Sequence, residues 1–326
     1  MQKPHIVIIS PALANANNGN WQTANRWARF LRTQYHVTIA KSWNDAIAAA
    51  GPDTPRAMIA LHARRSAESI AEAARSRPAL PIVLALTGTD LYRDIHNSAE
   101  AQRSMQLARH LVVLQSAGLE ALPPAERARA CVIYQSAAAL KPVLKSARAT
   151  PFDVVMIGHL RSEKDPLTFM RAAALLDAQP VRLTHIGGAL DPELGAQALA
   201  TQSRHACYRW RGNLPHAATR QALKRSQLLV IASRIEGGAN VIIEAVTSGV
   251  PVLASDIAGN RGMLGDDYDG YFPVGDSDAL AHRITQISAN PALHARLAAQ
   301  CAGRAPLFAP ERERAALLQL MDNVLN

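Results

Sequence analysis

Two carboxylates, Glu236 and Glu244, stand eight residues apart in the segment E-G-G-A-N-V-I-I-E. The first follows an apolar run at 228–231 and precedes two glycines, and the second lies within a predicted helix. Glycines let a ligand approach the backbone closely, and the N–H groups at a helix start favour phosphate oxygens. Carboxylates accept hydrogen bonds from sugar hydroxyls. The segment is compatible with a site for a phosphorylated sugar, but by itself this spacing favours a helix start whose acidic residues complement the dipole.

These residues require a framework, and the alternation of short apolar runs with helical stretches predicts parallel, doubly wound sheets. In the first half we predict strands at 5–9, 36–40, 57–61, 82–86, 111–114 and 131–134, with helices at 21–34, 65–77 and 98–110. In the second half we predict strands at 153–157, 181–186, 207–211, 228–231 and 251–254. Helices are expected there at 165–178, 216–226, 239–248, 277–288, 291–302 and 311–325.

A chain of 326 residues exceeds the size at which one core usually stops growing, so two domains are expected. The polar, proline-flanked stretch at 141–151 is the predicted linker. We assign residues 1–150 to a Rossmann-like N-terminal domain, 151–307 to a Rossmann-like C-terminal domain, and 308–326 to a helix that returns to the first. The expected fold class is α/β, with two facing doubly wound domains and a ligand cleft between their carboxyl strand edges.

The composition limits the class of protein further. Hydrophobic residues make up 48 % of the chain and charged residues 19 %, which is typical of a globular protein. The apolar runs are of strand length, and the N-terminal residues show no leader pattern, so we expect a soluble cytoplasmic protein. Three scattered cysteines predict neither a disulfide framework nor a zinc site.

The net charge of +9 lies entirely in the first half of the chain. Residues 1–150 hold 18 Lys and Arg against 9 Asp and Glu, whereas the remainder holds 17 of each. This asymmetry indicates an anionic partner, either nucleic acid, a membrane surface or a small phosphorylated substrate, unless arginine is simply frequent here. No nucleic-acid motif is present, and the basic helix at 21–34 is expected to pack on its sheet, so we expect neither nucleic-acid binding nor membrane association.

The second half, from Val154 to about Ile284, resembles the retaining GT-B glycosyltransferases of the sucrose-synthase-like family. Its segment G-H-L-R-S-E-K at 158–164 is similar to that family's G-R-L-x-x-E-K. The resemblance implies that Lys164 binds the diphosphate of a nucleotide sugar, that Glu236 lies near the transferred sugar, and that Glu244 holds the ribose. No metal or other cofactor is expected, because the D-x-D at 267–269 lies in a glycine-flanked turn.

Three positions depart from the family pattern. His159 stands where an arginine usually binds the diphosphate, Thr87 where many members have a histidine, and Gly262 where a glutamate is common. Arg161 lies two residues from the altered position. Through these departures and the segments at 19–24, 87–94 and 133–137, the chain resembles the selenosugar synthases of selenoneine biosynthesis. That resemblance implies transfer of glucose or N-acetylglucosamine from a UDP-sugar to selenophosphate, an anion that needs no base.

The site that these resemblances imply has three parts. We expect catalytic roles for Glu236, Lys164 and Asn20. Donor binding is assigned to Gly19, His159, Arg161, Lys164, Gly212, Glu236, Gly237, Gly238, Ala239, Asn240 and Glu244. Acceptor binding is assigned to Asn20, Thr23, Arg26, Thr87, Arg93, Gln135 and Ser136, although any one of these arginines can instead be a solvated surface residue. Two rival functions remain open: O-glycosyl transfer to a lipid or envelope glycan, and non-catalytic binding of a sugar nucleotide.

Overall fold

A computed structural model describes residues 3–13, 19–51, 54–141, 143 and 150–326. It divides into two compact units, Met1–Ser136 with Ala309–Asn326, and Ala137–Phe308. The chain thus changes units after Ser136, earlier than the position expected from the sequence. Asn18 and most of the linker expected at 141–151 lie outside the described residues.

The first unit is built on a six-stranded parallel sheet with the strand order β2-β1-β3-β4-β5-β6. The strands are β1 (His5–Ile9), β2 (His36–Ala40), β3 (Pro55–Leu61), β4 (Ile82–Leu86), β5 (His110–Val113) and β6 (Ala130–Val132). The helices that connect them are α1 (Gly19–Leu31), α2 (Trp43–Ala50), α3 (Ala67–Ser76), α4 (Ile95–Asn97), α5 (Ala99–Leu107) and α6 (Pro124–Arg127). Because β2 and β3 lie on opposite sides of β1, the strand order reverses between β1 and β3.

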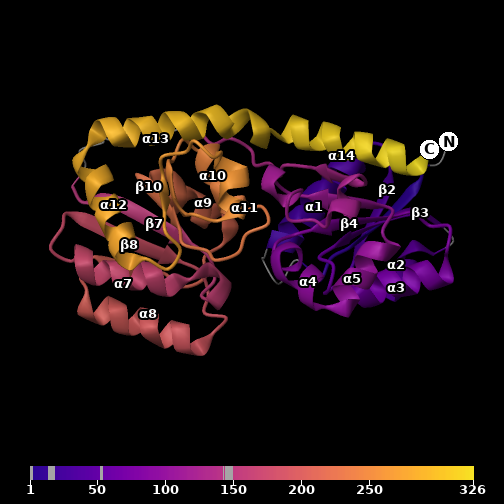
Figure 1. The fold of residues 1–326 in the computed structure, drawn as a ribbon, viewed down its shortest axis with the longest axis horizontal. Helices are drawn as coiled ribbons and strands as arrows, with labels where there is room; N and C mark the ends of the chain where they lie inside the picture. Colours follow the sequence, from indigo (N-terminus) through magenta and orange to yellow (C-terminus); the bar gives the residue numbers. More distant parts are fainter. Residues whose placement is uncertain (1–2, 14–18, 52–53, 142, 144–149) are drawn as a thin grey trace. The chain divides into compact units, whose positions relative to one another are not determined.

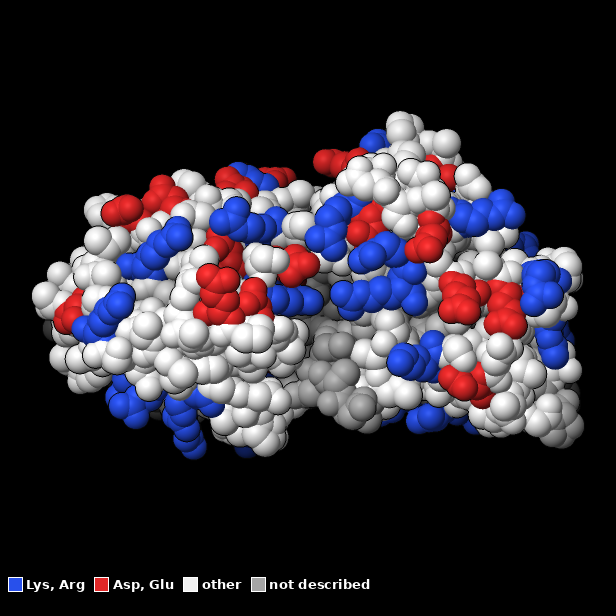
Figure 2. Space-filling model, turned by 90° about the horizontal axis from the view of Figure 1, so that it is seen from below, with Lys and Arg blue, Asp and Glu red and all other residues white. Residues whose placement is uncertain are grey.

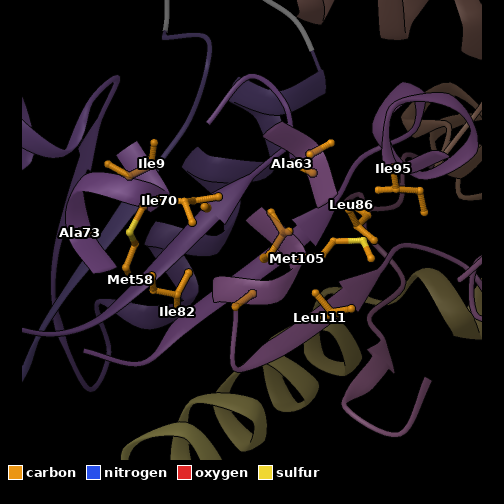
Figure 3. Packing of buried hydrophobic residues seen from close by; sticks show 14 of the residues in the cluster. Ile9, Met58, Ala63, Ile70, Ala73, Ile82, Leu86, Ile95, Met105 and Leu111 are labelled. Carbon is orange, nitrogen blue, oxygen red and sulfur yellow. The ribbon is translucent and has the colours of Figure 1, made fainter. Parts of the chain in front are cut away.

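Two apolar cores cover the two faces of this sheet. On one face α2, α3 and α5 cover the sheet, and Ile70 of α3 and Met105 of α5 share an apolar core with Met58 of β3 (Figure 3). On the other face α1 packs beside the last helix, α14 (Pro310–Leu325) (Figure 1). Leu317 and Met321 of α14 are fully buried in the same apolar core as residues of α1. The last helix therefore completes the core of the first unit.

The second unit repeats the design with the order β12-β11-β10-β7-β8-β9. Its strands are β7 (Phe152–Ile157), β8 (Val181–Ile186), β9 (Tyr208–Trp210), β10 (Leu228–Ile231), β11 (Val252–Ser255) and β12 (Tyr271–Phe272). Its helices are α7 (Pro166–Leu176), α8 (Pro192–Arg204), α9 (His216–Arg225), α10 (Asn240–Val246), α11 (Ala258–Leu264), α12 (Ser277–Ala289) and α13 (Pro291–Arg304). Helix α7 packs beside α8 and α12, and α10 beside α9 and α13 (Figure 1). The predicted α/β class with two doubly wound sheets is confirmed.

Candidate active site

The strand order of the second unit reverses between β7 and β10, which pair in parallel. In doubly wound sheets, ligands bind outside the carboxyl ends of the strands at such a reversal. The loop after β7 carries Lys164 and the loop after β10 carries Glu236, so both residues lie at this edge. The sequence separates them by 72 residues, and the topology brings them together.

Lys164 and Glu236 form a partly buried ion pair. The Nζ atom of Lys164 donates to Oε1 of Glu236 at 2.5 Å, and the hydroxyl of Ser233 donates to the same oxygen at 2.5 Å. The side chains are only 18 % and 8 % exposed. A buried charge is costly unless an opposite charge pairs with it, so the ion pair holds both side chains in place. One cation and one carboxylate thus stand together where a diphosphate and a sugar could each find a partner.

The backbone around this pair is unusually close-packed. A Cβ atom at Gly259 would lie 2.0 Å from the carbonyl oxygen of Glu236, so only glycine allows α11 to approach the Glu236 loop. Next to Lys164, Asp165 has a φ of +46°, forms an ion pair with Arg234 at 2.9 Å and accepts a hydrogen bond from the hydroxyl of Thr168 at 2.9 Å. The loops after β7 and β10 therefore hold each other in place.

Glu244 lies on α10 and is held by a residue that the sequence analysis did not identify. Its Oε1 atom is 2.6 Å from Nε2 of His216 at the start of α9, and its side chain is 12 % exposed. A carboxylate already oriented by an imidazole loses less freedom when it binds a hydroxyl. The spacing of His216 from Glu244, 28 residues on another helix, leaves no local pattern by which it could be found.

Two more of the predicted donor residues, His159 in the loop after β7 and Gly212 in the loop after β9, contact the glycines of the loop after β8. The backbone N–H of Gly188 donates to Nδ1 of His159 at 3.1 Å, and that of Gly187 donates to the carbonyl of Gly212 at 2.8 Å. Gly212 has a φ of +63°, which favours glycine. Arg161 has a buried Nε atom without a hydrogen-bond partner among the described residues. His159 and Gly212 therefore lie at the same carboxyl edge as Lys164.

The glycine segment 237–240 leads from Glu236 into α10. Gly237 and Ala239 are buried, and Gly238 and Asn240 are half-buried. Helix α10 begins at Asn240 and has seven residues, and the residue before it, Ala239, makes no side-chain cap hydrogen bond. The backbone of this segment thus lies directly between the two glutamates, Glu236 and Glu244.

In the first unit, four of the predicted acceptor residues make buried polar contacts, in two groups of hydrogen bonds. Nε of Arg26 donates to both carboxylate oxygens of Glu313, at 3.0 and 2.8 Å, and Ser136 donates to the second at 2.5 Å. Gln135 donates to the hydroxyl of Thr23, which donates to the carbonyl of Gly19 at 2.8 Å. The interpretation of Arg26 as a solvated surface arginine is wrong, because its side chain is 11 % exposed and ion-paired.

Thr87 and Arg93 lie apart from that network, after β4. The backbone N–H of Thr87 donates to Asp90 at 2.9 Å, and Nε of Arg93 donates to Asp94 at 3.2 Å. Asn20 is half-buried in the first turn of α1. The structure also places His62, which the sequence analysis overlooked, against this segment, with Nε2 at 3.0 Å from the hydroxyl of Thr89.

The described residues contain no group of three or more His, Cys, Asp or Glu side chains that could hold a metal ion. In the D-x-D segment, Asp269 is paired with Arg296 at 2.6 Å. Among the same residues, no helix combines the length and the apolar character that a membrane span requires.

Comparisons with known proteins agree with this geometry. Residues 144–304 match the family model described as glycosyl transferases group 1. The UDP-Gal:alpha-D-GlcNAc-diphosphoundecaprenol alpha-1,3-galactosyltransferase of Escherichia coli is 26 % identical over 166 residues. That match covers 48 % of this chain and 41 % of the relative, so the chain spans about two fifths of the relative's length.

Solved structures resemble the whole chain. The sucrose-phosphate synthase of Thermosynechococcus elongatus has a TM-score of 0.81 at 16 % identity, covering 99 % of both chains. HepE from Anabaena, in complex with UDP-glucose, has a TM-score of 0.78 at 16 % identity, covering 98 % of this chain and 99 % of its own. With two parallel six-stranded sheets flanked by helices, the fold is GT-B.

Proposed function

We propose that this chain is a glycosyltransferase that takes its sugar from a UDP-sugar and binds the donor on its second unit. The observation that carries the proposal is the partly buried pair of Lys164 and Glu236 at the strand-order reversal. The group 1 family model covers that same unit. The name of the Escherichia coli relative specifies UDP-galactose, and HepE binds UDP-glucose, which supports a UDP-sugar as donor.

Each charged residue at the carboxyl edge of the second sheet binds a different part of the donor. The Lys164 ammonium neutralises the diphosphate and stabilises the charge that grows on it as the bond to the anomeric carbon breaks. Glu236 accepts hydrogen bonds from the sugar hydroxyls, and Glu244 accepts them from the ribose. An ammonium that is already desolvated interacts more strongly with a developing charge than one in water. The bond from sugar to diphosphate breaks, the acceptor bonds to the anomeric carbon, and UDP leaves.

The acceptor that we propose is selenophosphate. Support comes from the segments at 19–24, 87–94 and 133–137, which resemble selenosugar synthases, and from the positive charge of the first 150 residues. Selenium attacks the anomeric carbon as UDP departs, forming a C–Se bond. Water then cleaves the P–Se bond and releases phosphate. An anionic nucleophile needs no general base, which accounts for Thr87 at the position where many family members have a histidine.

A second acceptor class is favoured by one specific observation. The Escherichia coli relative acts on a diphosphoundecaprenol-linked sugar, so transfer to a hydroxyl of a lipid-linked glycan is the alternative. Non-catalytic binding of a sugar nucleotide is the rival outside the enzymes. Only the lipid-linked alternative predicts activity with an uncharged hydroxyl group as nucleophile.

The test is to incubate the protein with UDP-glucose or UDP-N-acetylglucosamine and selenophosphate, and to look for a selenium-containing sugar by mass spectrometry. Lys164→Ala should abolish product, and Lys224→Ala, a half-buried lysine on α9, is the matched control. Faster transfer to a hydroxyl acceptor would overturn the selenophosphate assignment and leave the glycosyltransferase. Absence of transfer to every acceptor, with UDP still bound, would leave the binding protein.

A further inference from the structure

The two carboxylate oxygens of Glu236 have different surroundings. Its Oε1 atom accepts hydrogen bonds from Lys164 and from Ser233, both at 2.5 Å. No described residue donates a hydrogen bond to Oε2, and this atom is not among the buried side-chain atoms that lack a partner. Oε2 therefore reaches solvent, although the side chain as a whole is only 8 % exposed. One oxygen is held by the protein, and the other is available to a ligand.

Ser233 is itself held by a buried chain of hydrogen bonds. The hydroxyl of Ser255, at the end of β11, donates to the backbone carbonyl of Ser233 at 2.6 Å. The Nδ2 atom of Asn260, in α11, donates to the carbonyl of Ser255 at 2.9 Å and to its hydroxyl at 3.1 Å. Ser233, Ser255 and Asn260 are all fully buried. The chain thus runs from α11 through the end of β11 to the loop after β10, where it ends on Glu236.

The backbone of α11 approaches the same loop. A Cβ atom at Gly259, the residue before Asn260, would lie 3.1 Å from Cβ of Glu236 as well as 2.0 Å from its carbonyl oxygen. Only glycine lets the first turn of α11 come so close. This turn therefore contacts the backbone of Glu236 directly and supports its carboxylate through Asn260.

The buried chain is not explained by stability alone. The carbonyl of Ser255 can only accept, which directs Nδ2 of Asn260 toward it. Oδ1 of Asn260 is then left buried with no partner among the described residues. Such an atom is destabilising, whereas apolar groups of the same shape in place of hydrogen-bonded partners can be nearly neutral. Figure 2 shows Asp and Glu side chains on the open surface, where water solvates them and no buried donor is needed.

We propose that Ser233, Ser255 and Asn260 are positioning residues that hold Oε1 of Glu236 so that Oε2 accepts a hydrogen bond from the transferred sugar. The contact with the sugar rests on the proposed function, whereas the coupling of Ser233 to Glu236 does not. A carboxylate whose Oε1 atom is already fixed by two donors loses less freedom when Oε2 binds a hydroxyl. UDP carries no sugar, so this chain should affect the binding of a UDP-sugar and not that of UDP.

The test is calorimetry on the full chain, comparing UDP with UDP-glucose, UDP-galactose and UDP-N-acetylglucosamine and continuing with the sugar nucleotide that binds most tightly. Ser233→Ala should weaken its binding by about 10-fold, because a hydrogen bond that orients a charged group is lost. UDP affinity should stay unchanged, because Lys164 is retained. Ser233→Cys nearly preserves the volume but offers only a weak S–H donor, so it should behave like Ser233→Ala.

Ser248→Ala is the matched control for the loss of a buried hydroxyl. Ser248 is 1 % exposed, and its hydroxyl has no partner among the residues that the structure describes. Its replacement should change the affinity for neither ligand. Wild-type affinity for the sugar nucleotide in Ser233→Ala or in Ser233→Cys would overturn the proposal. Equal weakening of UDP and of the sugar nucleotide would also overturn it, because Ser233 would then act on the whole site.

A double-mutant cycle tests whether Ser233 acts through Glu236. In a Glu236→Gln background, Ser233→Ala should weaken binding of the sugar nucleotide by less than about 2-fold, because residues that act through one contact are not additive. The same loss in both backgrounds would contradict the positioning role. A wild type that binds no UDP-sugar would sink the proposed function, and the same cycle would then be measured on the free energy of unfolding in urea. Non-additive values there would still support the coupling of Ser233 to Glu236, and additive values would overturn it.

Discussion

Replacement of Glu313 by glutamine removes the negative charge at the centre of a buried network. Glu313 is 1 % exposed on α14 and accepts from Arg26, Ser136 and the indole N–H of Trp27, the last at 2.7 Å. The amide of glutamine can still accept hydrogen bonds, but it removes the carboxylate charge that Glu313 places against the buried guanidinium of Arg26. Because these contacts join α14 to α1, their loss should lower the free energy of unfolding of the whole first unit.

The expected cost follows from the burial of the pair. Breaking a buried ion pair by removing one partner destabilises a protein by about 3–5 kcal/mol. Both side chains are nearly inaccessible, 11 % for Arg26 and 0 % for Glu313, so solvent screens little of this. Replacing both partners at once, Arg26→Met with Glu313→Leu, leaves no isolated charge and should cost less than Glu313→Gln alone.

Urea denaturation followed by tryptophan fluorescence measures this free energy, because Trp21, Trp27 and Trp43 are in the first unit and only Trp210 is in the second. Glu311→Gln, an exposed substitution in the same helical turn, should cost less than about 1 kcal/mol. An unfolding free energy for Glu313→Gln within 1 kcal/mol of the wild type would refute this reasoning, as would a double variant less stable than Glu313→Gln.

Three other expectations can be checked directly. Glu244→Ala should weaken UDP binding by about 1.5–3 kcal/mol in calorimetry through loss of a charge-assisted hydrogen bond, and His216→Ala should weaken it less because His216 only orients the carboxylate. Burial lowers the pKa of His185 to about 4, so between about pH 6.5 and 4 the unfolded chain binds a proton that the folded unit does not. The free energy of unfolding of the second unit should therefore fall as the pH is lowered through that range, and His185→Phe should flatten the dependence in urea titrations at several pH values. Transfer activity should survive EDTA because Lys164 can neutralise the diphosphate, and a strict need for magnesium or manganese would contradict this.

The strands were the most predictable part of the fold. The predicted bounds of β1, β2, β4, β8 and β10 coincide with the observed ones, because each is a short, largely apolar run bounded by polar or turn residues. Helices α2, α4, α6, α8 and α11 were not predicted, although Ser42 and Asp191 cap α2 and α8 in the usual way. The apolar periodicity of α2 and α8 is similar to that of α12 and α13, which were predicted, so the cap and the pattern together could have identified both helices.

That Lys164 and Glu236 lie at one place was more readily predicted than the contacts of Arg26 and His62 in the first unit. Lys164 and Glu236 stand out in short motifs, and the topology brings them to 2.5 Å. Glu313 pairs with Arg26 across 287 residues of sequence, and no local pattern records such a pair. His62 was missed for another reason, since a positive φ in a non-glycine residue is imposed by its surroundings and leaves no trace in residue type.

The position of α14 also sets the order in which this chain can fold. During synthesis the strands of the first sheet emerge before the whole of Ala137–Phe308, yet the residues that cover Trp27 and Leu31 come from Pro310–Leu325. Contacts so distant in sequence form late and slowly. Until α14 has been synthesised, it cannot cover the apolar face of the first unit, and Arg26 lacks its ion pair with Glu313. The second unit, made in the interval, can therefore reach its final state before the first.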